Sequence, residues 1–448
     1  MARRNVLASC LFLFGLISLS FLLGAAVIFF DLPYSSFLRR AFYGGVSWYE
    51  QREASPPAEE QLPPPTVGQI DKADKTCDGF TLLLYGEGTA AVLVNMRGQV
   101  VHRWYVPYSK IWPDQPASDR KQDEKVYYAD AHLYPNGDLL VVMEGPADWR
   151  KRSFGYGLAK LDKDSHVLWK LNDNYHHGID VGEDGVIYAI CSEVLTKMPQ
   201  GLEYIPTPCI IDVVDVISLE GKQSKRIRLL EAFRDSPYAP LLCMLERGKL
   251  YGQASPPAPP GVVTTPPFYD EQRRRDVLHM NTVKVLSRAL APKFPLFKAG
   301  QLLISPRQLD AIAVLDPDSN KVVWAARGPW RAQHDPVFLE NGHLLLFDNM
   351  GSPHGSRVLE YDPQTQAFPW WYPGANGVPF YTRLRGMAQR LPNGNTLIVN
   401  SDGGETFEVT PDQEVVWSCS CGHVELKRAR RYLPEHLPFL GRDQRARP

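Results

Sequence analysis

The sequence lacks the short motifs that mark the most common catalytic and cofactor-binding sites. Its seven cysteines form no C-x-x-C pair and no zinc-ribbon spacing, so they predict neither a zinc finger nor a thioredoxin-like redox centre. No G-x-S-x-G nucleophile elbow and no nucleotide-binding fingerprint occurs. The net charge of −1 leaves no basic excess, and we expect no nucleic-acid partner. At 448 residues the chain is too long for one ordinary compact domain unless it is built from repeats.

The N-terminus carries the one long apolar run. Residues 5–30 contain no charged side chain, and an α-helix needs about 20 such residues to cross a bilayer. The alternative is a cleaved signal peptide, but the small residues at 24–26 are followed by more apolar residues rather than by a cleavage site. The positive-inside rule weakly favours a cytoplasmic N-terminus, residues 1–4. We expect a single-pass membrane protein whose globular part is extracytoplasmic, on the periplasmic or extracellular side.

A proline-rich tether is expected at residues 31–76. Within it, residues 51–70 hold five prolines, several charges and few apolar side chains. This composition favours an extended linker over a folded domain. An extracytoplasmic domain can form disulfides, and a bridge from Cys77 to Cys419 or Cys421 would join its two ends.

Two short sequence motifs alternate after the tether and predict a repeat of four strands. The first is a tight turn followed by an apolar strand, at residues 134–142 (YPNGDLLVV), 183–190 (EDGVIYAI), 339–347 (LENGHLLLF) and 391–399 (LPNGNTLIV). The second ends in a tryptophan-bearing strand, at residues 94–104, 161–169, 315–324 and 409–417. Asn-Gly and Asp-Gly suit tight β-hairpins, and the strands that follow are rich in Leu, Val and Ile.

Units of this size predict an all-β fold, a six-bladed β-propeller. The units begin near residues 78, 128, 175, 277, 332 and 384. A β-sandwich of hairpins is the alternative, but it does not explain why the two sequence motifs alternate in a fixed order. We therefore expect a propeller over residues 77–417, behind an N-terminal transmembrane helix.

Two stretches break the period. Residues 234–276 are proline-rich and form a long loop, either a lid over the axis or a disordered insertion. Residues 418–448 are a basic C-terminal tail, for which a packed and solvated end segment is favoured over a lipid-binding patch.

Histidines recur at one place in the repeat. In a propeller the innermost strands line the central channel, so equivalent residues converge. His177 and His334 each lie eight residues before a turn glycine, and His279 takes a comparable place before a longer insertion. A lone strand histidine is usually structural, but three of the 11 histidines at equivalent sites indicate a functional cluster. His132, three positions later in its own unit, is a weaker fourth candidate.

Arg307 adds a positive charge to this cluster. It follows an apolar strand that should form a hairpin with the strand of His279. An arginine in the same cavity favours an anion and disfavours a bound cation. We therefore expect no metal and no cofactor.

Three segments resemble the arylsulfate sulfotransferase family: residues 279–283 (HMNTV), 303–308 (LISPRQ), and 333–342 (QHDPVFLENG) with 346–349 (LFDN). Residues 80–104 and 385–397 also look familial, so the resemblance extends over about 78–417. The family consists of propeller enzymes that move a sulfuryl group between phenols without the nucleotide donor PAPS. The resemblance thus implies an aryl sulfate and a phenol as small-molecule partners.

The resemblance also implies roles for individual residues. His334 matches the nucleophile that is transiently sulfated, while His279, Arg307 and His177 match the residues around the sulfuryl group. His176 is the alternative to His177, because the two are adjacent, and Asn281 is a further secondary candidate.

Two other interpretations stay open at this point. Three converging histidines also suit a zinc, copper or iron enzyme. The propeller also suits a non-catalytic binding or scaffold module tethered to a membrane.

Overall fold

The computed structural model describes residues 67–86, 88–115, 123–146, 154–248, 276–374, 380–422 and 424–441. The predicted cytoplasmic N-terminus and membrane anchor, residues 1–30, lie outside these ranges, as does most of the tether. Across the described ranges no helix is both long and apolar enough to cross a bilayer.

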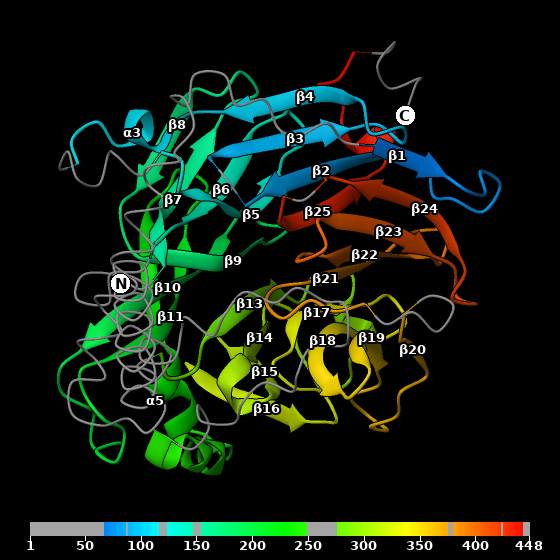
Figure 1. Ribbon diagram of the computed structural model, residues 1–448. Helices are drawn as coiled ribbons and strands as arrows, with labels where there is room; N and C mark the ends of the chain where they lie inside the picture. The colour runs from blue at the N-terminus through cyan, green and yellow to red at the C-terminus, as the bar shows by residue number, and fades with distance from the viewer. Residues whose placement is uncertain are drawn as a thin grey trace, which may run out of the picture. The chain divides into compact units, whose positions relative to one another are not determined.

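The fold is mainly β, and its strands form six antiparallel sheets around a common axis (Figure 1). The first three blades are listed from the inner to the outer strand. Blade 1 contains β25 (Leu426–Tyr432), β2 (Phe80–Tyr85), β3 (Ala90–Val94) and β4 (Val100–Tyr105). Blade 2 contains β5 (Tyr127–Leu133), β6 (Leu139–Glu144), β7 (Gly155–Leu161) and β8 (Val167–Leu171). Blade 3 contains β9 (Tyr175–Val181), β10 (Ile187–Leu195), β11 (Cys209–Ile217) and β12 (Gln223–Arg228).

The last three blades repeat the same order. Blade 4 contains β13 (Met280–Val285), β14 (Leu302–Pro306), β15 (Ala311–Asp316) and β16 (Lys321–Arg327). Blade 5 contains β17 (His334–Phe338), β18 (Leu344–Ser352), β19 (Gly355–Tyr361) and β20 (Trp370–Tyr372). Blade 6 contains β21 (Met387–Arg390), β22 (Thr396–Asn400), β23 (Glu405–Val409) and β24 (Val415–Ser420), and β1 (Val67–Ile70) adds a fifth, outer strand.

The inner strands form a closed ring. Each contacts the next in the order β5, β9, β13, β17, β21 and β25, and β25 contacts β5. The six repeat units predicted from the alternating sequence motifs are thereby confirmed. The strands β2, β6 and β14 are buried over their whole length because neighbouring blades cover both faces, as continuous apolar runs predict.

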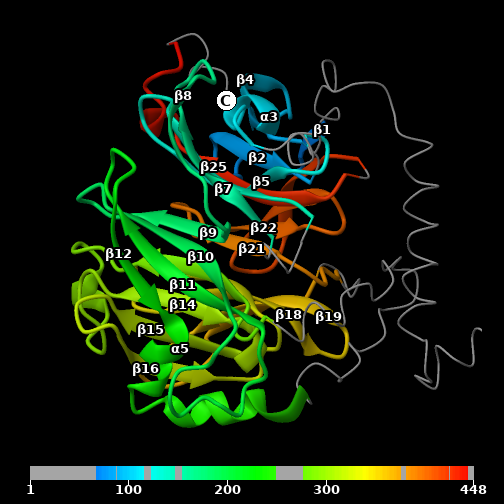
Figure 2. The same cartoon turned by 90° about the vertical axis from the view of Figure 1, so that its left-hand side faces the viewer.

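Short helices lie in the connections between strands. Their bounds are α3 (Tyr108–Ile111), α5 (Leu229–Arg234), η1 (Ala239–Gly248), η2 (Ala291–Lys293), η3 (Arg307–Leu309) and η5 (Pro434–His436). Helix α5 packs against β11 and β16, at the lower end of the view in Figure 2. The described start of the long insertion, η1, contacts α5 and η3. Residues 249–275 of the insertion lie outside the described ranges, so its role as a lid stays a prediction.

The C-terminal segment extends the propeller past the boundary predicted at residue 417. Strand β25 pairs with β2 from Phe80–Tyr432 to Tyr85–Leu426, and the two strands lie side by side in Figure 1. The basic tail was expected to be a packed and solvated end segment, and β25 is packed: several of its arginines form ion pairs with internal carboxylates, as with Arg431 and Glu408. At the other boundary, β1 places the last residues of the expected tether in a sheet.

The disulfide expected at Cys77 is not formed in this structure. Cys77, Cys419 and Cys421 are free thiols, and all three are buried in the same hydrophobic cluster.

Candidate active site

Bulges interrupt the inner strands that carry the predicted site residues. The pairing register shifts opposite His177 in β9, after Met280 in β13 and after His334 in β17. His177 and His279 have φ angles of 55° and 50°, which non-glycine residues adopt uncommonly. Bulges re-aim side chains and are common beside active sites. The polar side chains here are thus released from the regular alternation of a β-strand.

His334 is buried at the start of β17 with both ring nitrogens engaged. Its Nδ1 lies 2.7 Å from Asn349 Oδ1 and 3.0 Å from the Ala332 carbonyl oxygen. Both partners are acceptors, so Nδ1 carries the hydrogen. The Nε2 atom accepts the backbone N–H of Arg385 at 3.2 Å. Burial, followed by the charge of Arg307, holds the pKa of His334 well below its usual value. The ring is therefore a neutral imidazole whose lone pair is on Nε2.

The orientation of Asn349 supports this assignment. Its Nδ2 donates to the carbonyl oxygens of Thr382 and Arg385, at 2.8 Å each. The amide oxygen is then the atom left to face His334. Asn349 thus fixes the tautomer of His334.

His279 lies beside His177 and forms a pair with Asp276. Its Nδ1 is 2.6 Å from Asp276 Oδ2, and its ring centroid is 4.9 Å from that of His177. The register shows that His279 is not at the repeat position expected for it. Val285, Val181 and Phe338 are the last residues of their strands, and four residues before them lie Asn281, His177 and His334. His279 reaches the cluster from two residues farther back.

Arg307 lies where the hairpin argument predicted. Met280 pairs with Pro306, and the Arg307 backbone N–H donates to the His279 carbonyl oxygen at 3.3 Å. The side chain is buried, at 7% exposure, and its charge is the second cause of the lowered pKa of His334. Arg307 therefore supplies a buried positive charge near His334, while its backbone contacts His279.

His176 and His177 each contact a buried carboxylate. His176 Nε2 lies 3.1 Å from Asp212 Oδ1, and His177 Nδ1 lies 3.1 Å from Glu144 Oε1. The two rings meet at a distance of 2.8 Å between their Nδ1 atoms. Burial lowers the pKa of His177 well below its usual value. Burial also opposes the charged form of His176, but the carboxylates of Asp212, Glu144 and Asp276 together outweigh it and raise the pKa of His176. Of the two, His177 is the neighbour of His279.

Glu144 connects both sides of the cluster. It accepts the His177 backbone N–H at 2.6 Å through Oε1 and the Arg385 guanidinium at 2.8 Å through Oε2. Tyr127 donates its hydroxyl to Glu144 Oε2 at 3.0 Å. Burial opposes ionisation of Glu144, but contact with His177 and the charge of Arg385 hold its pKa well below the usual value. Blades 2, 3 and 6 are joined through this one carboxylate.

The two secondary candidates have other contacts. Asn281 Nδ2 donates to the Gln333 carbonyl oxygen at 2.7 Å, and thereby links β13 to the residue before His334. His132 packs edge-on against Tyr134, with ring centroids 4.7 Å apart. Burial and the charge of Arg430 lower the pKa of His132 to about 4. His132 thus belongs with a second set of inner-strand residues.

We call this second set the axial charge group, and it consists of Asp130, Asp180, Lys284, Asp335, Arg428 and Arg430. Arg428 lies 2.9 Å from Asp335 and 3.8 Å from Asp130. Lys284 and Arg430 interact electrostatically with both Asp130 and Asp180. The set holds three cations and three carboxylates, so its charges balance.

The site could hold a cation only poorly. Glu144, His176 and His177 each offer a ligand atom within 4.8 Å of the others. However, Glu144 is already paired with Arg385, and Arg307 adds a further positive charge. The other such group, Asp173, Cys191 and Asp215, is filled by the guanidinium of Arg226, 2.7 Å from both carboxylates. Buried arginines beside neutral imidazoles suit an anion instead.

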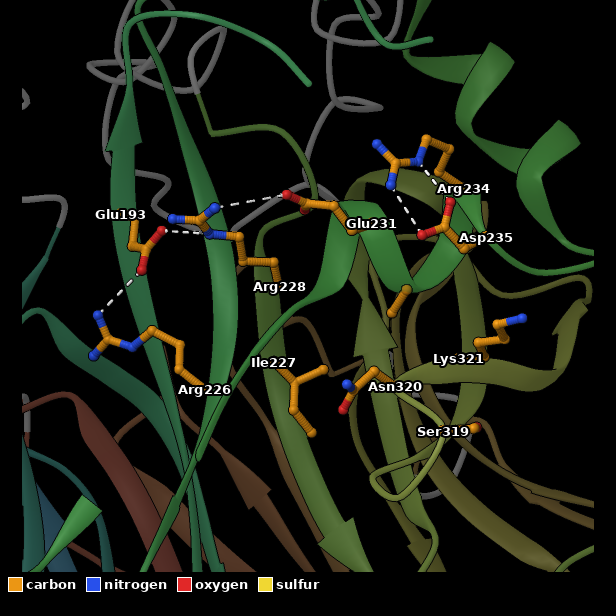
Figure 3. A pocket seen from close by; sticks show the side chains of 11 residues that line it. Glu193, Arg226, Ile227, Arg228, Glu231, Arg234, Asp235, Ser319, Asn320 and Lys321 are labelled. Carbon is orange, nitrogen blue, oxygen red and sulfur yellow. Dashed lines mark hydrogen bonds and ion pairs between the residues drawn. The ribbon is translucent and has the colours of Figure 1, made fainter. Parts of the chain in front are cut away.

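A separate groove of about 590 Å³ lies between β12, α5 and the turn from β15 to β16 (Figure 3). Its charged side chains pair with one another. Arg226 and Arg228 both contact Glu193, at 3.2 and 2.9 Å, and Arg234 contacts Asp235 at 2.7 Å. The groove contains none of the predicted site residues.

Fold and site together define a class: a six-bladed β-propeller whose inner strands converge on a buried cluster of histidines and an arginine. Residues 131–422 match the family model described as arylsulfotransferase (ASST). The match covers more than half of the chain, and this protein belongs to the arylsulfotransferase family.

Three solved structures are distantly similar to the chain. A protein of unknown function from Bacteroides caccae is 12% identical with a TM-score of 0.45, over 76% of this chain and 93% of the other. A streptogramin B lyase is 11% identical with a TM-score of 0.39, over 79% and 86%. A catalytically inactive virginiamycin B lyase from Staphylococcus aureus is 8% identical with a TM-score of 0.38, over 78% and 87%. Among curated proteins none matches the chain.

Sequence reasoning did not assign five residues that contact the predicted histidines: Glu144, Asp212, Asp276, Asn349 and Arg385. Asn349 and Arg385 lie in segments that resemble the family, and Asp276 precedes His279 by three residues, so a local signal existed for these. Glu144 and Asp212 lie in the second and third strands of their blades. Only the three-dimensional fold brings them to the histidines.

Proposed function

We propose that this protein transfers a sulfuryl group from an aryl sulfate to a phenol through a sulfohistidine at His334. The observation that carries the proposal is the hydrogen bonding of the His334 ring. A neutral imidazole with Nδ1 bound to two acceptors has its lone pair on Nε2, which is the form a nucleophile needs.

The first half of the reaction forms an N–S bond. The Arg385 backbone N–H that Nε2 accepts in the resting site is released, the Nε2 lone pair attacks sulfur, and the S–O bond to the aryl group breaks. The phenoxide takes a proton from a cluster imidazole that is in its protonated form, which leaves that imidazole neutral. The ring of His334 gains positive charge as the bond forms, and the oxygens of Asn349 and Ala332 stabilise it at Nδ1. Arg307 stabilises the negative charge on the sulfuryl oxygens.

The second half reverses these steps with a different phenol. The acceptor phenol loses its proton to an imidazole, its oxygen attacks sulfur, and the N–S bond breaks. His334 leaves as the neutral ring that the hydrogen bonds of the resting site already favour. His279, paired with Asp276, and His177 are the two imidazoles beside the reacting group.

The test is intact-protein mass spectrometry of the full-length chain after brief exposure to 4-nitrophenyl sulfate. We expect one added sulfuryl group on His334 that is discharged by added phenol. His334→Asn should form no adduct, while the control His343→Asn, a hydrogen-bonded histidine elsewhere in blade 5, should form it normally. An adduct on another residue would show that His334 is not the nucleophile. If neither an adduct nor released nitrophenol were detected, the proposed chemistry would be contradicted.

We extend the proposal to location: residues 5–30 anchor the chain, with the propeller extracytoplasmic. The uncharged run of these residues supports it. Alkaline carbonate extraction, which removes peripheral proteins, should leave the chain in the membrane, and external protease should reach the propeller in intact cells or spheroplasts. Release by carbonate would contradict the anchor.

A further inference from the structure

Four buried side chains form a continuous chain of contacts behind the His334 site. They run from Asp212 through His176 and His177 to Glu144. The contacts are 3.1 Å from Asp212 Oδ1 to His176 Nε2, 2.8 Å between the two Nδ1 atoms, and 3.1 Å from His177 Nδ1 to Glu144 Oε1. Each of the four side chains is at most 11% exposed. No step of the proposed reaction uses His176 or Asp212.

The contact between the two Nδ1 atoms restricts where hydrogen atoms can lie. One nitrogen must donate and the other must accept, because two lone pairs or two N–H groups at 2.8 Å would repel. A neutral imidazole carries one hydrogen, so the choice at Nδ1 also decides the state of Nε2. The His176–His177 contact therefore controls the far nitrogen of His177.

Two arrangements satisfy the contact between the two rings and differ by one proton. When the Asp212–His176 pair holds the extra proton, His176 Nδ1 donates to His177 Nδ1, and His177 carries its hydrogen on Nε2. In this first arrangement the His177 Nδ1 lone pair also faces Glu144 Oε1, 3.1 Å away, so the charge of the Asp212–His176 pair has to offset that repulsion. When that proton leaves, His176 keeps its hydrogen on Nε2 toward Asp212. His177 Nδ1 then donates to His176 and Glu144, and its Nε2 becomes an acceptor.

We propose that the Asp212–His176 pair sets the tautomer of His177, and thereby decides whether His177 Nε2 donates or accepts a hydrogen bond in the sulfuryl site. The inference rests on the proposed function for its consequence, although the tautomer itself is independent of substrate. His176 and Asp212 are positioning residues in this scheme. A ring that uses Nδ1 within the chain of contacts has only Nε2 left for a ligand.

The carboxylates around His176 stabilise its protonated form. Acidic groups face it from three elements: Asp212 in β11, Glu144 in β6, and Asp276 before β13. The neighbouring His177 is itself kept neutral by burial, with His279 and Arg385 also disfavouring its charge. The pKa of His176 is raised by Asp212 although burial opposes the charge.

The consequence is a dependence of sulfuryl uptake on pH. Below the pKa of His176, His177 Nε2–H donates to the sulfuryl oxygens or to the departing phenoxide. Above it, that donor is lost, and the rate at which His334 takes up the sulfuryl group falls. His177 Nε2 then offers a lone pair, which suits acceptance of a proton from the second phenol.

Nuclear magnetic resonance of the full-length chain with ¹⁵N-labelled histidine tests the inference directly, because the ring nitrogen shifts distinguish the tautomers. As the pH rises, His177 should change from the Nε2–H to the Nδ1–H form at the same midpoint at which His176 loses its proton. A His177 tautomer that stays constant while His176 titrates would overturn the inference.

Two variants sharpen the test. Asp212→Asn should lower the shared midpoint by at least about 1 pH unit, since a neutral amide no longer stabilises the imidazolium. His176→Gln should make the His177 tautomer independent of pH. The control Asp162→Asn removes the carboxylate of an exposed His–Asp pair, 3.0 Å apart, and should leave the midpoint and the uptake rate unchanged.

Single-turnover uptake from 4-nitrophenyl sulfate links the tautomer to the rate. The wild-type rate should fall above the His176 midpoint, and the fall should move with that midpoint in Asp212→Asn. A rate that is unaffected by the tautomer change, with normal sulfohistidine formation, would overturn the inference and leave the proposed function intact. A tautomer change without any sulfohistidine would contradict the proposed function instead.

Discussion

The inner strands carry two polar regions that differ in how their charges are arranged. The axial charge group matches three cations with three carboxylates, in buried ion pairs such as Arg428 with Asp335. The histidine cluster keeps His334 and His177 neutral by burial and places the charge of Arg307 near His334. In buried sites, matched charges hold structure together, while a cation held among neutral imidazoles prepares a place for an anionic ligand. Variants in the two regions should therefore fail in different ways.

The largest effect is expected at the nucleophile. His334→Asn should lower turnover by at least about a thousandfold, since no other group in the site takes the place of Nε2. The melting temperature should stay close to that of the wild type because the amide retains a hydrogen-bonding shape. Steady-state assay with 4-nitrophenyl sulfate and a phenol, together with calorimetry, measures both. A turnover within tenfold of the wild type would exclude this role.

The next effect is expected at Arg307. Arg307→Lys should lower kcat by about 10²–10³-fold, because a point charge does not reproduce the fork of donors that stabilises a developing anion. The control Arg327→Lys lies in the same blade and contacts the Leu309 carbonyl oxygen. It should retain near-normal kcat. Equal losses in the two variants would mean that Arg307 acts through the fold.

The reverse pattern is expected in the axial charge group. Arg428→Gln leaves Asp335 buried without its cation, and the loss of one partner of a buried pair costs about 3–5 kcal/mol. Arg228→Gln removes an exposed contact to Glu193 and should cost no more than about 1 kcal/mol. Urea unfolding measures both. If Arg428→Gln instead lowered turnover of the folded protein as strongly as Arg307→Lys, the two regions would not be separate.

The smallest effect is a change of stability with pH. The pKa values of His334 and His177 are lowered in the folded state, chiefly by burial. Below about pH 6.5 the unfolded chain binds protons that the folded chain does not, so stability falls with decreasing pH. Each such histidine contributes up to about 1.4 kcal/mol per pH unit in this window. Unfolding free energies at pH 7 and 5.5 should differ less in His334→Asn than in the wild type, while the exposed His166→Asn should match the wild type.

Much of the fold followed from local signals in the sequence. The turns at Gly137, Gly185, Gly342 and Gly394 adopt φ angles between 81° and 89°, which glycine accepts without strain. Because the same turn recurs at a fixed place in four units, and the tryptophan-bearing strand marks others, the number of blades could be counted. The closing strand β25 could not be placed this way, since it is separated in sequence from the sheet that it completes.

The candidate site was predictable only in part. Histidines before a turn are visible in the sequence, but their bulges are not, and the position of His279 depends on one. The carboxylates Glu144 and Asp212 come from the second and third strands of their blades, at sequence separations that no local pattern connects. They also influence the protonation of His176 and His177, so the chemistry of the site depends on residues that no local sequence pattern reveals.

The order of synthesis gives β25 a further significance. A nascent chain exposes β2 with an unpaired edge until residues 426–432 have emerged and paired with it. Open strand edges are templates for association with other chains. Because Arg428 reaches Asp335 only after this pairing, a truncated product would lack both the last strand and the ion pair across the axis. The ring of blades therefore closes only when residues 426–432 have paired with β2.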